Sequence, residues 1–132
     1  MLCIIAGSRD AMEPDVIYAL DHCPWRDSIK SVMSGTSWGA DRHGERWAKS
    51  RGLEVVRFPA EWDQYGMSAG PRRNKEMAEN ADCLVAVWNG YSCGTKSMID
   101  SARKKSVKTM IYYYSENRIS FPEEEEVQLS LF

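Results

Sequence analysis

The chain of 132 residues lacks any long apolar run, since none approaches the roughly 20 residues that span a membrane. Its first seven residues carry no basic group of the kind that opens a signal peptide, so we expect a cytoplasmic protein without a membrane partner. Cysteine is sparse, and Cys3, Cys23, Cys83 and Cys93 form neither a Cys-x-x-Cys pair nor a cluster with histidine. We therefore expect free thiols, with no metal site and no disulfide framework.

A strong excess of one charge is also missing, because 17 basic and 19 acidic residues leave a net charge of −2. Residues 115–132 contain one basic and five acidic residues, a net charge of −4, whereas residues 1–114 contain 16 basic and 14 acidic residues, a net charge of +2. A net charge of only +2 over residues 1–114 does not indicate direct DNA binding. We expect residues 1–114 to form one domain and residues 115–132 to form a flexible acidic tail.

Apolar runs alternate with helical patterns along residues 1–114, and most of the runs end at glycine or proline. Runs without strict polar alternation are typical of strands that are buried on both faces of a parallel sheet. The pattern predicts an α/β fold, a Rossmann-like doubly wound sheet of about five parallel strands with helices on both faces. The predicted strands cover residues 2–6, 29–33, 53–58, 83–88 and 107–114, the predicted helices cover residues 14–22, 40–50, 71–80 and 94–105, and residues 60–70 are expected as a loop.

Three predicted strand ends, at residues 7–9, 34–41 and 89–95, carry glycine beside small polar residues. Glycine lets backbone amides approach an anion, and a following helix adds unpaired N–H groups and the positive end of its dipole. Turns between strands and helices need glycine anyway, so each loop alone is a weak signal, but three on one sheet edge predict a phosphate-binding rim. Neither the GxGxxG dinucleotide fingerprint nor the P-loop motif is present.

Two arginines, Arg72 and Arg73, begin a predicted helix, where positive charge opposes the helix dipole and suggests a bound anion or an acidic neighbour. Arg73 and Asn74 together offer a guanidinium fork and an amide that suit phosphate and sugar hydroxyls. Two roles are equally consistent with Asp41: to bind a ribose hydroxyl of the ligand, or to stabilise the first turn of its own helix. One of the four aromatic residues near strand ends could stack on a base. The aromatic candidates are Trp38, Trp62, Tyr65 and Trp88, and the expected ligand contacts are Gly7, Ser8, Arg9, Gly35, Thr36, Gly39, Asp41, Arg73, Asn74, Gly94 and Thr95.

Four ordered motifs, at residues 4–9, 34–41, 70–74 and 94–96, resemble the YspA-type branch of the SLOG superfamily, and the resemblance covers about residues 2–114. That superfamily includes the LOG phosphoribohydrolases and the DNA-processing proteins of the DprA type. The resemblance implies a Rossmann-like domain that binds a nucleotide or nucleotide-derived ligand at these loops, with no further cofactor identified. The sequence leaves the oligomeric state open, with a homodimer among the alternatives.

Two positions depart from the resembling families. Thr36 stands where the branch usually has a second glycine, and Met98 stands where the LOG pattern has its catalytic glutamate. Catalytic residues therefore stay unassigned, and we expect a ligand-binding module rather than an enzyme. The alternatives are a phosphoribohydrolase-like enzyme that cleaves an N-glycosidic bond of a nucleotide, and a DprA-like DNA-binding domain.

The last five residues, at positions 128–132, read QLSLF and resemble the peptide by which bacterial proteins bind the DNA polymerase sliding clamp. This resemblance implies a place in replication, repair or a phage–host context. Three large apolar side chains directly after four glutamates also agree with a docking peptide. The alternative is that the apolar residues fold back onto the domain. The expected clamp contacts are Gln128, Leu129, Leu131 and Phe132.

Overall fold

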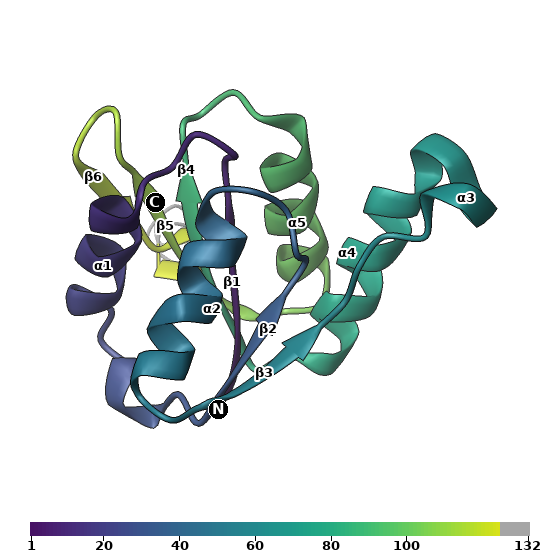
Figure 1. Cartoon of the computed structure of the whole chain (residues 1–132). Coiled ribbons are helices and arrows are strands. Elements are labelled where there is room, and N and C mark those ends of the chain that lie inside the picture. The colour runs from purple at the N-terminus through teal and green to yellow at the C-terminus, as the bar shows by residue number, and fades with distance from the viewer. Residues whose placement is uncertain (125–132) are drawn as a thin grey trace.

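Residues 1–124 are described by the computed structural model, and their strands form one sheet in the order β3-β2-β1-β4-β5-β6 (Figure 1). Strands β1 to β5 run parallel, which confirms the expected α/β sheet, and β6 joins it antiparallel to β5. The elements are β1 (Leu2–Gly7), α1 (Glu13–Asp21), the 3-10 turn η1 (Arg26–Ser28), β2 (Ser31–Ser34), α2 (Ala40–Ser50), β3 (Glu54–Arg57), α3 (Trp62–Tyr65), the 3-10 turn η2 (Gly66–Ser68), α4 (Ala69–Asn80), β4 (Cys83–Trp88), α5 (Cys93–Lys104), β5 (Lys108–Tyr113) and β6 (Arg118–Ser120).

The sheet separates two apolar cores because consecutive residues of a strand point to opposite faces. Ile5 of β1 packs into the core under α1 and α2, which also contains Trp47 of α2. Its neighbour Ile4 packs into the core under α4 and α5, together with Met77 and Met98. This two-sided burial is the reason why the central strands are continuous apolar runs in the sequence.

The strand order reverses between β1 and β4, which lie side by side in the middle of the sheet. The chain leaves β1 toward β2 on one side and leaves β4 toward β5 on the other. A Cβ on Gly7 would overlap the Val87 carbonyl, so glycine allows the ends of the two strands to approach closely. In doubly wound sheets, ligands bind at such a point, beyond the carboxyl ends of the strands.

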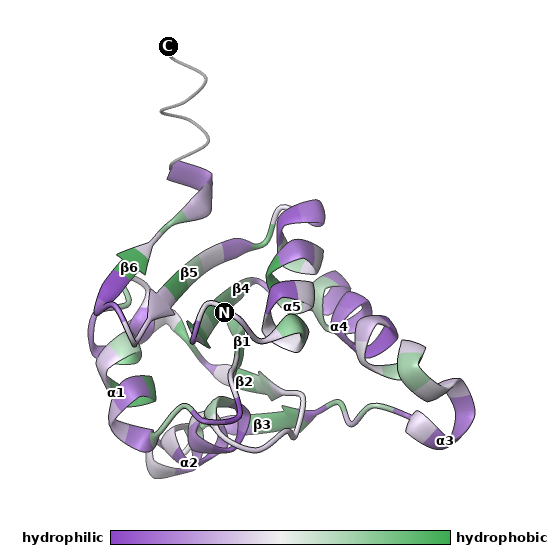
Figure 2. Ribbon diagram, turned by 90° about the horizontal axis from the view of Figure 1, so that it is seen from above, coloured by the Kyte–Doolittle hydropathy of each residue, from purple (hydrophilic) through white to green (hydrophobic). Residues whose placement is uncertain are grey.

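Residues 62–68, which we call the arm, differ from the expected loop because they form α3 and η2. The arm stands away from the sheet beside the start of α4 in both ribbon views (Figures 1 and 2). Helix α4 begins at Ala69, two residues before Pro71. In contrast, the predicted bounds of β4 and α2 agree with the structure.

The expected flexible tail also differs from the structure, since residues 118–120 form β6. Phe121 packs against Trp25 with 6.2 Å between the ring centroids, and a carboxylate oxygen of Glu123 accepts the Thr109 N–H at 2.6 Å. Ile119 and Phe121 bury apolar surface against the core under α1 and α2, which explains why residues 118–121 join the domain. The expected clamp contacts lie in residues 125–132, outside the described residues. Between residues 1 and 124, no helix has both the length and the apolar character of a membrane span.

Candidate functional site

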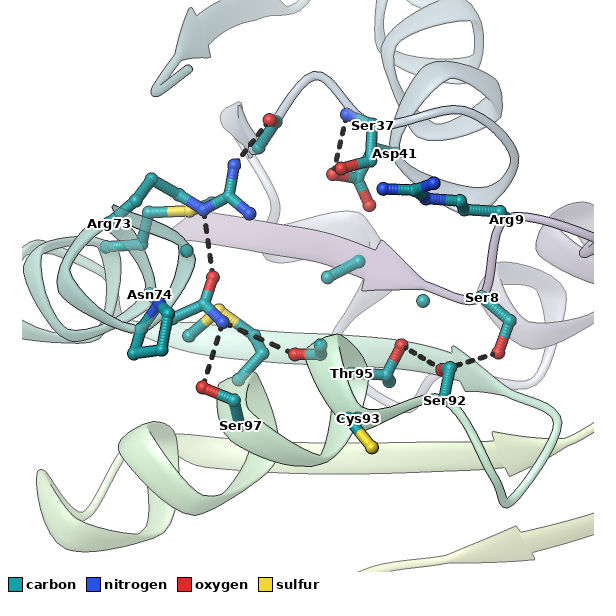
Figure 3. A pocket seen from close by; sticks show the side chains of 18 of the residues that line it. Ser8, Arg9, Ser37, Asp41, Arg73, Asn74, Ser92, Cys93, Thr95 and Ser97 are labelled. Carbon is teal, nitrogen blue, oxygen red and sulfur yellow. Dashed lines mark hydrogen bonds between the residues drawn. The ribbon is translucent and has the colours of Figure 1, made fainter. Parts of the chain in front are cut away.

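A cavity of about 570 Å³ lies at the carboxyl ends of β1 and β4, where the strand order reverses (Figure 3). It is lined by the loops after β1, β2 and β4, by residues of α4 and α5, by Asp41 of α2 and by Trp62 of α3. The structure thus brings nine of the expected ligand contacts together around one space. These are Gly7, Ser8, Arg9, Gly35, Asp41, Arg73, Asn74, Gly94 and Thr95, whereas Thr36 and Gly39 do not line it.

Thr36 and Gly39 instead shape the loop after β2. Gly39 has a φ of +80°, and a Cβ there would overlap the carbonyl oxygens of Ser8 and Arg9. Thr36 has a φ of +68°, a left-handed conformation that costs a β-branched residue roughly 1–2 kcal/mol. Its N–H donates to the Ser34 hydroxyl at 3.0 Å, and this bond holds the turn. The glycine that the resembling branch usually has at this position therefore has a conformational reason.

A chain of hydroxyl groups joins the loop after β1 to the start of α5. The buried Ser8 hydroxyl accepts the N–H of Asn89 at 2.9 Å and lies 3.1 Å from the Ser92 hydroxyl. Ser92 donates onward to the Thr95 hydroxyl at 2.8 Å. The side-chain oxygen of Asn89 accepts two backbone N–H groups, including that of Ser92 at 2.9 Å. These bonds hold the first turn of α5 against the cavity, where helical N–H groups have no intrahelical partner.

Arg73 is held by backbone oxygens from two other loops. Its Nη1 donates to the carbonyls of Gly35 at 2.6 Å and Phe58 at 3.2 Å, and its Nε donates to Asn74 Oδ1 at 2.9 Å. Burial lowers the pKa of Arg73, and the negative charge of Asp41 partly opposes this effect. Within residues 1–124 no carboxylate lies at ion-pair distance from Arg73 or from Arg9. The cavity therefore has two guanidinium groups without a salt bridge in the described chain.

The side chain of Asn74 makes hydrogen bonds within the protein, a role that the sequence did not predict. Its Oδ1 accepts from Arg73, and its Nδ2 donates to the Gly94 carbonyl at 3.3 Å and to the Ser97 hydroxyl at 3.1 Å. Both ends of the amide are thus used inside the protein, and the residue links α4 to α5. Asn74 fixes the orientation of Arg73 rather than offering a free amide to a ligand.

Asp41 lies at the N-terminal end of α2 and is 5% exposed. Burial raises its pKa to about 6, although the N–H of Ser37 and the charge of Arg73 favour the ionised form. The Ser37 N–H donates to Oδ2 at 3.2 Å, so the carboxylate stabilises the loop after β2. A Cβ on Gly35 would lie 2.8 Å from both this oxygen and Arg73 Nη1, so glycine leaves room for the two charged groups. Figure 3 shows Arg9 and Arg73 entering the cavity from opposite sides.

Several lining residues were not among the expected contacts. Ser92 precedes the first residue of α5, a position that favours serine, so the helix start in the sequence could have indicated it. Met77 and Met98 give the cavity an apolar floor from the core side of α4 and α5. In the sequence they cannot be distinguished from the other core positions of these helices, so they were not predicted as cavity residues. Met98 is 2% exposed, so an apolar group faces the cavity where the LOG pattern has a carboxylate.

Among the aromatic candidates, Trp62 lines the cavity, and Trp38, Tyr65 and Trp88 do not. Exposed Cys93 also lines it, and Cys3, Cys23 and Cys83 are buried free thiols. Residues 1–124 hold no group of three or more histidine, cysteine, aspartate or glutamate side chains that could bind a metal ion.

Known proteins resemble this chain in two ways, through a phage relative and through a family model. Over 82 residues the chain is 34% identical to "Gene 61 protein" of Mycobacterium phage D29, and the match covers 58% of this chain and 66% of the phage protein. No solved structure matches the chain significantly. Residues 1–65 match the YspA, cpYpsA-related SLOG family, so the half of the chain that contains β1, β2 and the loops after them is similar to that family.

Proposed function

We propose that the cavity binds a nucleotide or a nucleotide-derived ligand. The observation that carries this proposal is the pair of guanidinium groups, Arg9 and Arg73, which face one cavity together with the first turn of α5. Guanidinium groups and helix N-termini both bind phosphate oxygens. A volume of about 570 Å³ is in the range of small-molecule sites. The match of residues 1–65 to a SLOG family supports the same class of ligand.

The test is a thermal-denaturation and calorimetric screen of the full chain against nucleotides and nucleotide sugars. A ligand at 100 times its dissociation constant stabilises the folded state by about 2.7 kcal/mol. Arg9→Ala removes an exposed side chain and should weaken binding about 10-fold or more, because bonds to charged groups are strong. Arg46→Ala is the matched control, since Arg46 is exposed on α2 and does not line the cavity. Equal affinity of Arg9→Ala and Arg46→Ala, or no binding by the wild type, would contradict the proposal.

The two alternatives have distinct readouts in the same screen. Release of free base from a nucleoside monophosphate would favour the hydrolase, although the buried Met98 supplies no acid or base. Tight binding of single-stranded DNA by the full chain would favour a DprA-like domain. We do not expect hydrolysis, because Asp41 is the one carboxylate that is both buried and cavity-lining in residues 1–124, and it already accepts the Ser37 N–H. We do not expect DNA binding, because residues 1–114 have a net charge of only +2.

We further propose that residues 128–132 dock on a bacterial sliding clamp, in a replication, repair or phage–host context. The support is the QLSLF sequence, and the similarity to a phage protein agrees with a phage context. Titration of a bacterial clamp with the full chain should give roughly micromolar binding. The double variant Leu131→Ala/Phe132→Ala should lose that binding, and Ser130→Ala should keep it. Equal binding by both variants, or none by the wild type, would refute clamp docking.

A further inference from the structure

Trp62 differs from the other aromatic candidates because its ring faces have no aromatic or cationic partner within residues 1–124. The guanidinium of Arg42 lies 3.8 Å from the ring centroid of Trp38. Arg72 covers Tyr65 in the same way at 4.4 Å. The free ring is also the one that lines the cavity, and it is 55% exposed.

The indole ring of Trp62 packs against the start of α4. Gly70 is buried, and a Cβ there would lie 3.3 Å from Trp62 Cη2, so the indole rests against the bare glycine backbone. Pro71 lines the cavity next to it, and Met77 follows two turns later on the same helix. This end of the cavity therefore contains a flat, half-exposed aromatic surface and two apolar side chains, beside Arg73 of the same helix.

The second guanidinium group, that of Arg9, enters from the opposite side of the cavity. Arg9 and Ser8 lie in the loop after β1, and Figure 3 shows them across the cavity from Arg73 and Asn74 of α4. A ligand with an anionic group at the Arg9 end thus directs its remainder toward α4 and the arm. An aromatic face binds a base through stacking, and replacement of such a residue by alanine weakens binding about 5- to 150-fold per base.

We propose that Trp62 recognises a planar, aromatic ring of the ligand by stacking and so selects intact nucleotides over sugar phosphates. This inference rests on the proposed function and assigns the base end of the same cavity to the arm. The chemical class that it predicts is a phosphorylated nucleoside whose base lies between Trp62 and the apolar residues Pro71 and Met77.

The experiment compares calorimetric binding of adenosine, guanosine, cytidine and uridine monophosphates with binding of ribose 5-phosphate to the full chain. The wild type should bind at least one nucleotide about 10-fold or more tightly than ribose 5-phosphate. Trp62→Ala should weaken binding of that nucleotide about 10-fold or more and leave ribose 5-phosphate affinity within about 2-fold. Trp62→Phe should keep most of the nucleotide affinity, because a phenyl ring still stacks. Trp38→Ala is the matched control, since Trp38 is 66% exposed and lies outside the cavity.

The outcomes separate this inference from the function on which it rests. If Trp62→Ala binds nucleotides as the wild type does, or weakens both ligand classes equally, the stacking role is wrong while nucleotide binding stands. If the wild type binds ribose 5-phosphate as tightly as every nucleotide, base recognition is also wrong. If the wild type binds none of these ligands, the proposed function itself fails. Circular dichroism of each variant checks that the exposed substitution leaves the fold intact.

Discussion

The β2 side of the cavity is shaped by backbone conformation, whereas its α4 side is fixed by hydrogen bonds that side chains donate to other segments. On the β2 side, Gly39 and Thr36 adopt positive φ angles, and Gly35 leaves space between two charged groups. On the α4 side, Arg73 and Asn74 reach backbone and hydroxyl oxygens of distant segments. Backbone conformations of this kind restrict a position to glycine or a few other residues, so the β2 side leaves a pattern that sequence comparison can detect.

The match to the SLOG family agrees with this contrast, because it covers residues 1–65 and therefore the β2 side. The α4 side begins at Ala69 and lies beyond the match. Many different polar side chains can link two helices, so such contacts leave a weaker pattern. If the contrast is right, substitutions on the two sides should fail in different ways.

The largest effect should come from Gly39→Ala, which tests whether backbone shape governs the β2 side. The new Cβ would overlap the carbonyl oxygens of Ser8 and Arg9 in a conformation that disfavours alanine. The free energy of unfolding should fall by about 3 kcal/mol or more in urea denaturation. Gly52→Ala is the matched control, because Gly52 also has a positive φ, +70°, but a Cβ there would meet nothing within 4 Å. Equal losses in the two variants would contradict the close approach.

On the α4 side, Asn74→Ala should lower the free energy of unfolding by about 2–3 kcal/mol, since it strips the partner from the Nε of a half-buried guanidinium. Nucleotide affinity should fall too, because Arg73 would lose its orientation. The control is Asn80→Ala on the same helix, where an exposed amide donates to the Glu76 carbonyl. A loss in Asn74→Ala no greater than that control would refute the positioning role.

A pH titration should isolate the contribution of Asp41. Burial raises its pKa from 3.8 to about 6, so the folded chain binds more protons than the unfolded chain between these values. The resulting stabilisation is present below about pH 4 and is lost as the pH rises through 6, a change of about 2 kcal/mol between pH 4 and 7. Asp41→Asn removes this titration, so the stability of the wild type relative to the variant should decline over that range. A difference that stays constant from pH 4 to pH 7 would contradict the raised pKa.

The smallest effect should be a gain from Thr36→Gly. Glycine removes a left-handed strain of roughly 1–2 kcal/mol, but it also raises the entropy of the unfolded chain by roughly 0.5–1 kcal/mol. The net rise in the free energy of unfolding should therefore lie between about 0 and 1.5 kcal/mol. Ser106→Gly is the comparison, with a φ of +56° at a residue that is not β-branched, and its gain should be smaller. Destabilisation by Thr36→Gly would show that the threonine side chain contributes more than its backbone costs.

The predictable parts of the fold are those that local physical chemistry controls. The apolar run of β4 and the helical pattern of α2 determine their own bounds, and the glycine loops predict an anion-binding edge. The sequence did not predict the helical turns of the arm, because α3 is one short turn, Trp62–Tyr65, whose position depends on how the chain enters α4. The sequence did not predict β6 either, because three residues, Arg118–Ser120, carry too short a pattern, and they form a strand by pairing with β5.

The amino-acid sequence alone predicts the alternating elements, the two-sided apolar strands and six of the polar residues that line the cavity, namely Ser8, Arg9, Asp41, Arg73, Asn74 and Thr95. These features depend on residues near one another in the chain, through propensity, periodicity and glycine geometry. The folded chain alone shows that Arg73 reaches the loop after β2, that Asn74 links α4 to α5, and that Trp62 is the aromatic candidate that lines the cavity. The physical reason is separation along the chain: Arg73 contacts Gly35 across 38 residues, and Ser8 contacts Ser92 across 84, so folding alone brings these groups together.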